Sequence, residues 1–60
     1  MKKWFKVLEI NNTESCVVED LETGQVISIN EKTTNEREAQ MIEKVDKFDL
    51  IVGDEFRIEW

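Results

Sequence analysis

The stretch CVVEDLETGQVISIN, residues 16–30, constrains the fold of this chain more than any other part of its sequence. Two runs rich in β-branched residues flank Gly24, and glycine readily takes the left-handed backbone conformation that a three-residue hairpin turn requires. Ile27 and Ile29 fall on one face of the second run, with a polar side chain between them. The stretch therefore predicts an antiparallel β-hairpin with one buried face.

Residues 2–10, KKWFKVLEI, predict a further strand, because they are rich in aromatic and β-branched side chains. The apolar pattern of this strand changes phase along its length. Phe5 and Val7 share one face, whereas Leu8 and Ile10 share the other. This change indicates either burial on both faces of the strand or a β-bulge near Leu8.

Residues 31–48, EKTTNEREAQMIEKVDKF, predict a short helix. Thr33 is followed three residues later by Glu36, which is a capping-box pattern for the start of a helix. Apolar side chains then recur at the spacing of one helix face, at Met41, Ile42, Val45 and Phe48. The competing interpretation is a strand through Ala39, Met41, Glu43 and Val45. We favour the helix, because the strand would turn Ile42 to the wrong side.

The segment DLIVGDEFRIEW, which follows, predicts two short strands around a turn. Residues 50–52 alternate as one strand, and Gly53 breaks it at a tight turn whose backbone Asp54 can bond. The second strand is half-buried and carries its apolar side chains at Phe56, Ile58 and Trp60. Phe48 and Phe56 are expected in the core. The adjacent acids Asp54 and Glu55 are expected to be turn and surface residues rather than a catalytic pair.

These elements predict a single domain, residues 1–60, of the mainly β (α+β) class. Three strands, one short helix and two more strands form a five-stranded antiparallel barrel-like sheet. That order, with the Val52-Gly53-Asp54 corner before the last strand, resembles small barrels of the OB and SH3-like kind. The alternative is an all-β SH3-like barrel without the helix. In style the chain also resembles short proteins of Gram-positive bacteria and their phages, which implies a bacterial or phage accessory protein.

The chain has no histidine and a single cysteine, Cys16. This composition excludes histidine acid–base catalysis, Cys-His dyads and zinc sites built from Cys and His. We therefore expect no enzymatic activity, no cofactor and no metal, and we expect Cys16 to be a core residue. One cysteine cannot form an intramolecular disulfide, and charges interrupt the apolar residues near Met1. A cytoplasmic protein without membrane contact is expected.

Acidic residues dominate the charge of the chain, which is −6 at pH 7. This balance argues against direct nucleic-acid binding, because such binding depends on cations that displace counterions. The predicted hairpin carries its acids without a neighbouring base, at Glu19, Asp20 and Glu22, and further acids follow at Asp49, Asp54, Glu55 and Glu59. Our leading hypothesis is a non-enzymatic binding module that engages a protein partner, basic or nucleic-acid-handling, through this acidic surface.

The alternative function depends on Trp4 and Trp60, which lie on strands that a barrel often brings together. Basic residues accompany them in the sequence at Lys3, Lys6 and Arg57. Such a cluster could stack the bases of a single nucleic-acid strand. Weak self-association is a further expectation, since a small core gains by burying apolar surface and edge strands can pair between copies. Two tryptophans exposed side by side would indicate a binding platform, whereas buried tryptophans would be part of the core.

Overall fold

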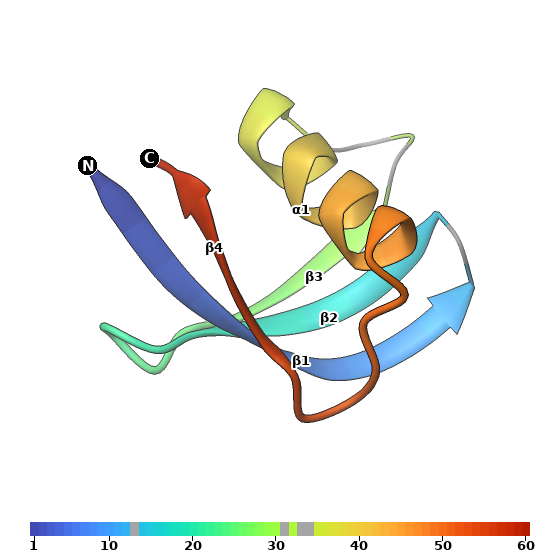
Figure 1. The fold of residues 1–60 in the computed structure, drawn as a ribbon, viewed down its shortest axis with the longest axis horizontal. Helices are drawn as coiled ribbons and strands as arrows, with labels where there is room; N and C mark the ends of the chain where they lie inside the picture. Colours follow the sequence, from blue (N-terminus) through green and yellow to red (C-terminus); the bar gives the residue numbers. More distant parts are fainter. Residues whose placement is uncertain (13, 31, 33–34) are drawn as a thin grey trace.

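The computed structural model describes residues 1–12, 14–30, 32 and 35–60. This part of the chain forms β1 (Lys2–Asn12), β2 (Ser15–Asp20), β3 (Val26–Asn30), α1 (Glu36–Lys47) and β4 (Glu55–Glu59). The strands make one antiparallel sheet in the order β3-β2-β1-β4, which curves around α1 (Figure 1). The mainly β class with one helix is confirmed. The five-stranded barrel is wrong, because the sheet has four strands and is open, with β3 and β4 at its free edges.

The hairpin and the bulge are found where the sequence predicts them. β2 pairs antiparallel with β3, and Gly24 takes the left-handed conformation with φ +79°. The connecting loop, residues 21–25, is longer than the three-residue turn that we expected. In β1, the pairing with β2 shifts register between Val7 and Glu9. This shift is the bulge indicated by the change of apolar phase, and it increases the local bend and twist of a long strand.

α1 confirms the helix over the competing strand. Its N-cap is Asn35, whose side-chain oxygen accepts a hydrogen bond from the Glu38 backbone N–H at 2.9 Å. The Asn35 amide in turn donates to the Glu38 carboxylate at 3.1 Å, so the two side chains stabilise the first turn together. The predicted cap, Thr33, lies outside the described residues. Within the described ranges, no helix is long and apolar enough to cross a membrane.

The strand predicted at residues 50–52 is wrong, because the end of α1 uses this segment. Asp49 takes a left-handed backbone conformation, with φ +50°. The Asp49 N–H donates to the Asp46 carbonyl, and the Leu50 N–H donates to the Val45 carbonyl at 3.0 Å. This pair of bonds is a Schellman cap. It turns Leu50 back over the end of the helix, so no extended segment is left to pair with the sheet.

The turn before β4 forms as predicted. Gly53 has φ +97°, and its N–H donates to the Val7 carbonyl at 2.8 Å. The Asp54 carboxylate accepts the Ile51 backbone N–H at 2.9 Å. Asp54 therefore stabilises the turn that directs the chain into β4 alongside β1.

The core lies between α1 and the concave side of the sheet. Its buried side chains are Phe5, Val7, Cys16, Val18, Ile29, Met41, Ile42, Val45, Phe56 and Ile58. The prediction for Phe56 is confirmed, but the one for Phe48 is wrong, because Phe48 is the C-cap of α1 and is exposed. Cys16 is a core residue, as predicted, and burial raises the pKa of its thiol. The thiol is therefore poorly activated as a nucleophile.

Candidate binding surface

Trp4 and Trp60 lie on opposite sides of the sheet. Phe5 of β1 points to the concave side, where its ring centroid is 5.8 Å from that of Trp60. Trp4 precedes Phe5 and points to the convex side, because side chains alternate along a strand. It is paired with Arg57 of β4, whose guanidinium carbon is 5.6 Å from the Trp4 ring centroid. The predicted cluster is therefore divided, with Lys6 and Arg57 on the same side as Trp4.

Trp60 belongs to a packed group on the concave side. Its ring is partly buried against the core. Two cations face this ring, with Lys3 Nζ at 4.4 Å and Arg37 Cζ at 4.5 Å from its centroid. Trp60 thus connects the chain after β4 to β1 and α1. It acts as a packing residue, and the platform of two tryptophans that would stack nucleic-acid bases is not formed.

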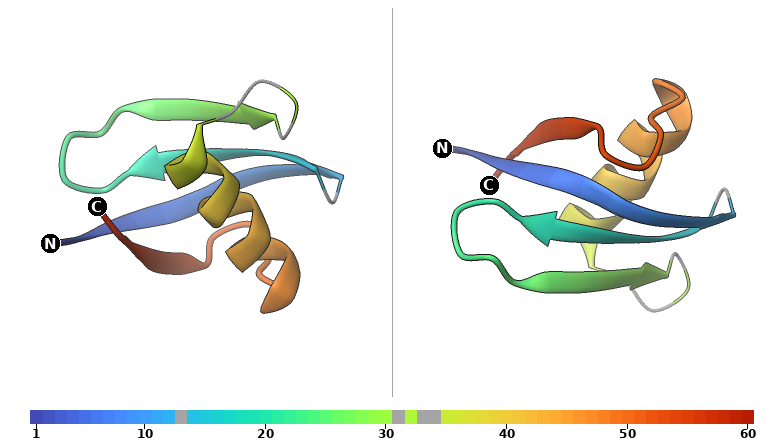
Figure 2. Two further views of the ribbon diagram at one scale, coloured as in Figure 1. Left: turned by 90° about the horizontal axis from the view of Figure 1, so that it is seen from above. Right: turned by 90° about the horizontal axis from the view of Figure 1, so that it is seen from below.

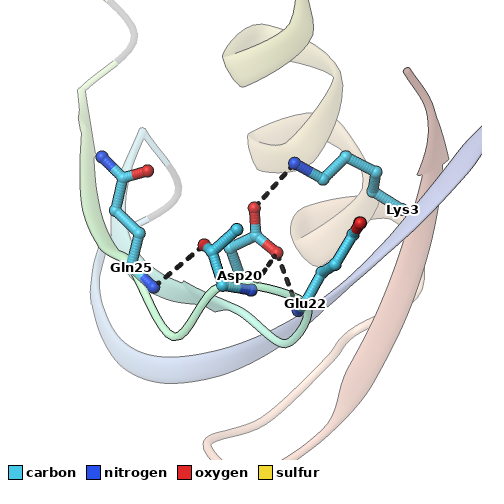
Figure 3. A network of polar contacts seen from close by, with 5 residues as sticks. Lys3, Asp20, Glu22 and Gln25 are labelled. Atoms are coloured by element: carbon cyan, nitrogen blue, oxygen red, sulfur yellow. Dashed lines mark hydrogen bonds and ion pairs between the residues drawn. The ribbon is translucent and has the colours of Figure 1, made fainter.

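Asp20 is buried rather than part of an exposed acidic surface, with 3% of its surface accessible. Its Oδ2 forms an ion pair with Lys3 Nζ at 2.8 Å, and its Oδ1 accepts the Glu22 backbone N–H at 2.9 Å (Figure 3). The hydrogen bond from Lys3, followed by the backbone bond from Glu22, lowers the pKa of the Asp20 carboxyl. Asp20 therefore attaches the hairpin loop to β1.

The other predicted acids are spread over the convex side and the hairpin loop. Lys6 lies in register between Glu19 of β2 and Glu55 of β4, so an acidic residue is its cross-strand neighbour on each side. Glu22 is exposed in the loop that follows β2. These acids do not form one continuous surface with Asp20.

A groove that the sequence did not predict runs along the free edge of β4. It has a volume of about 340 Å³ and is lined by Trp4, Lys44, Phe48, Leu50, Glu55, Phe56 and Arg57. Trp4 is 48% exposed and Phe48 is 59% exposed. Lys44 of α1 reaches the edge strand, where its ammonium donates to the Arg57 carbonyl at 2.6 Å. The groove therefore combines exposed aromatic rings with charged side chains.

A second pocket, of about 330 Å³, lies between the β1–β2 hairpin and the end of α1. Its lining is mostly apolar and includes Ile10, Ile42 and Leu50. In the described part of the chain, no three His, Cys, Asp or Glu side chains gather closely enough to hold a metal ion. The lining of this second pocket is thus suited to apolar contacts.

Comparison with family models, with curated proteins and with solved structures finds no match to this chain. Its function is therefore inferred from its own surfaces.

Proposed function

We propose that the protein is a non-enzymatic module that binds an apolar segment of another protein in the groove along β4. The observation that carries this proposal is the exposure of two aromatic side chains, Trp4 and Phe48, in one groove. A chain of sixty residues has little apolar surface to spare from its core, and exposed apolar patches often mark interaction sites. Aromatic anchors surrounded by polar residues also supply most of the binding energy at protein interfaces.

The partner is held by its side chains rather than by an added strand. The Asp54 carbonyl accepts from the Val7 N–H at 2.8 Å and the Trp60 N–H donates to the Met1 carbonyl at 2.7 Å, so these groups at the two ends of β4 face β1. Backbone groups alternate in direction along a strand, so those of Arg57 face the free edge of β4. Lys44 already donates to the Arg57 carbonyl and obstructs an added strand at its centre. An apolar side chain that enters the groove does not need this carbonyl.

Basic residues beside the apolar anchor of the partner complement the charge of this chain. The net charge is −6, and Glu55, which lines the groove, is exposed. Such a charge attracts a cationic partner during encounter, and salt weakens the attraction. We therefore still propose a basic protein partner, but its binding site is the aromatic groove rather than the acidic hairpin.

Selection of a random peptide library on the immobilised protein tests this function. We expect enriched peptides in which an apolar residue lies among Lys or Arg residues. Their Kd should rise by about tenfold or more in Trp4→Ala and in Phe48→Ala, because each change removes an aromatic anchor. Val52→Ala is the matched control, since Val52 is as exposed as Phe48 but does not line the groove. The proposal fails if no peptide is enriched or if binding survives both aromatic substitutions.

A further inference from the structure

The two free edges of the sheet differ in how they are protected. β4 has the sequence EFRIE with three charged residues, and Lys44 donates to its Arg57 carbonyl. β3 has the sequence VISIN, which carries no charge and no proline, and its pairing with β2 has no bulge. Charges, prolines and bulges are the devices that keep an edge strand from pairing with another chain. Of the two edges in the described sheet, β3 is therefore the one open to strand addition.

The backbone groups that β3 offers follow from its pairing with β2. The Asp20 N–H donates to the Gln25 carbonyl at 2.8 Å, so the Gln25 carbonyl faces β2. Every second residue then bonds to β2, and the residues between direct their N–H and C=O groups away from it. Val26 and Ser28 are such outward residues, and Val26 is 60% exposed. Figure 2 shows β3 at the outer margin of the sheet in both of its views.

We propose that β3 pairs antiparallel with β3 of a second copy of this chain in a two-fold dimer. The axis passes beside Ile27, so Val26 of each protomer lies opposite Ser28 of the other. These two pairs exchange four backbone hydrogen bonds. Between them, the two Ile27 side chains meet as a non-hydrogen-bonded pair, the closer kind of cross-strand pair. The two sheets become one continuous sheet.

Self-pairing suits β3 better than β4. No charged residue lies on β3, so the dimer brings no like charges together across the new pair of strands. A β4 pair centred on Arg57 would place Arg57 opposite its own copy and Glu55 opposite Glu59, which is repulsive. Ile27 is only partly buried in one chain and gains an apolar neighbour.

Because the chain is acidic, the effect of salt distinguishes a second copy of the chain from a basic peptide as the molecule that pairs with the β3 edge. Each copy carries −6, which opposes association at a distance, so salt should strengthen the dimer by screening. A basic peptide strand at the same edge would be attracted instead, and salt would weaken its binding. This inference does not rest on the groove along β4.

Sedimentation equilibrium of the full chain, at rising protein concentration and at two salt concentrations, tests the dimer. We expect a species of twice the monomer mass, and its fraction should rise with protein concentration and with salt concentration. Ser28→Pro removes one outward N–H from each chain, which an edge strand tolerates, and should raise the dimer Kd by about tenfold or more. Ser28→Ala keeps the N–H and should dimerise as the unmodified chain does; circular dichroism checks that both variants fold. A monomer at every concentration up to about 1 mM, or a dimer that Ser28→Pro leaves unchanged, overturns the proposal.

Disulfide cross-linking tests the register. In a Cys16→Ala background, one chain carries Val26→Cys and another carries Ser28→Cys, and they are oxidised separately and as a mixture. Opposed residues have Cα atoms about 5.5 Å apart, within reach of a disulfide, whereas the two copies of either cysteine lie more than about 7 Å apart. We therefore expect a linked dimer in the mixture alone. A link formed by the Ser28→Cys chain with itself overturns this register, and the absence of a link in the mixture overturns the pairing.

Discussion

The two sides of the sheet use the same kinds of residue for different purposes. On the concave side, Trp60 is partly buried and both Lys3 and Arg37 face its ring. On the convex side, Trp4 is 48% exposed, and Arg57 lies 5.6 Å from its ring centroid. Each tryptophan thus has basic residues beside it, but only one has a core behind it. Packing against α1 makes the Trp60 ring part of the fold, whereas the Trp4 ring stays half exposed.

A core substitution on the concave side should have the largest effect on stability. Phe5 is fully buried, and its ring centroid lies 5.8 Å from that of Phe56 and 5.8 Å from that of Trp60. Phe5→Ala should lower the free energy of unfolding by about 3–5 kcal/mol, through lost burial and the cavity that remains. A domain of this size has a total stability of about 3–9 kcal/mol, so much of this variant should be unfolded at 25 °C.

Urea unfolding followed by circular dichroism measures the effect at Phe5. Phe5→Leu is the matched control, because it leaves a smaller cavity and should cost less. A loss of less than about 1 kcal/mol in the free energy of unfolding of Phe5→Ala would contradict the assignment of the core to the concave side of the sheet.

A smaller, pH-dependent effect should come from the Asp20 ion pair on the concave side. The Lys3 hydrogen bond lowers the pKa of Asp20 in the folded chain. The stabilisation is therefore complete above the ordinary aspartate pKa of about 4, and it is lost as the pH falls through the lowered folded value. The free energy of unfolding of the unmodified chain should fall over this range. Asp20→Asn should be less stable at neutral pH and should lose less stability on acidification.

Urea midpoints between pH 7 and about pH 2 measure the contribution of Asp20. Glu22→Gln is the matched control, because the Glu22 side chain is exposed and only its backbone N–H bonds Asp20. Some pH dependence of stability should remain in Asp20→Asn, because the hydrogen bond with the Met1 amine lowers the pKa of the Glu59 carboxyl. An Asp20→Asn variant with the pH profile of the unmodified chain would show that the buried ion pair does not contribute to folding.

Local sequence patterns predicted the hairpin and the helix correctly, whereas the predicted closure of the sheet into a barrel was wrong. The residue types around Gly24 and the apolar stripe of α1 each specify an element through the period of their own side chains. The fifth strand failed because Asp49 takes the left-handed position where a helix end usually has glycine. Without that glycine, residues 50–52 looked extended.

The candidate site was harder to predict because it depends on register. The strands that carry Trp4 and Trp60 do pair, but Trp4 faces Arg57, which is an odd number of residues from Trp60. An odd offset places two side chains on opposite sides of a sheet. One signal for the groove was present in the sequence: residues 48–52 include four large apolar side chains, more than the last turn of a helix can bury, and two of them, Phe48 and Leu50, line the groove.

The smallest effect on stability should come from Trp4, the exposed member of the tryptophan pair. Trp4→Thr should change the free energy of unfolding by about 1 kcal/mol or less, because the ring is half exposed and threonine is favourable in strands. Trp60→Thr makes the same chemical change on the concave side and should cost about 3 kcal/mol, since it removes a ring packed on Phe5. Urea unfolding of both variants gives the two losses in the free energy of unfolding, and their difference measures how much packing on the concave side, under α1, contributes to stability. Equal losses would make Trp4 a packing residue as well, and its exposure in the groove would then no longer indicate a binding role.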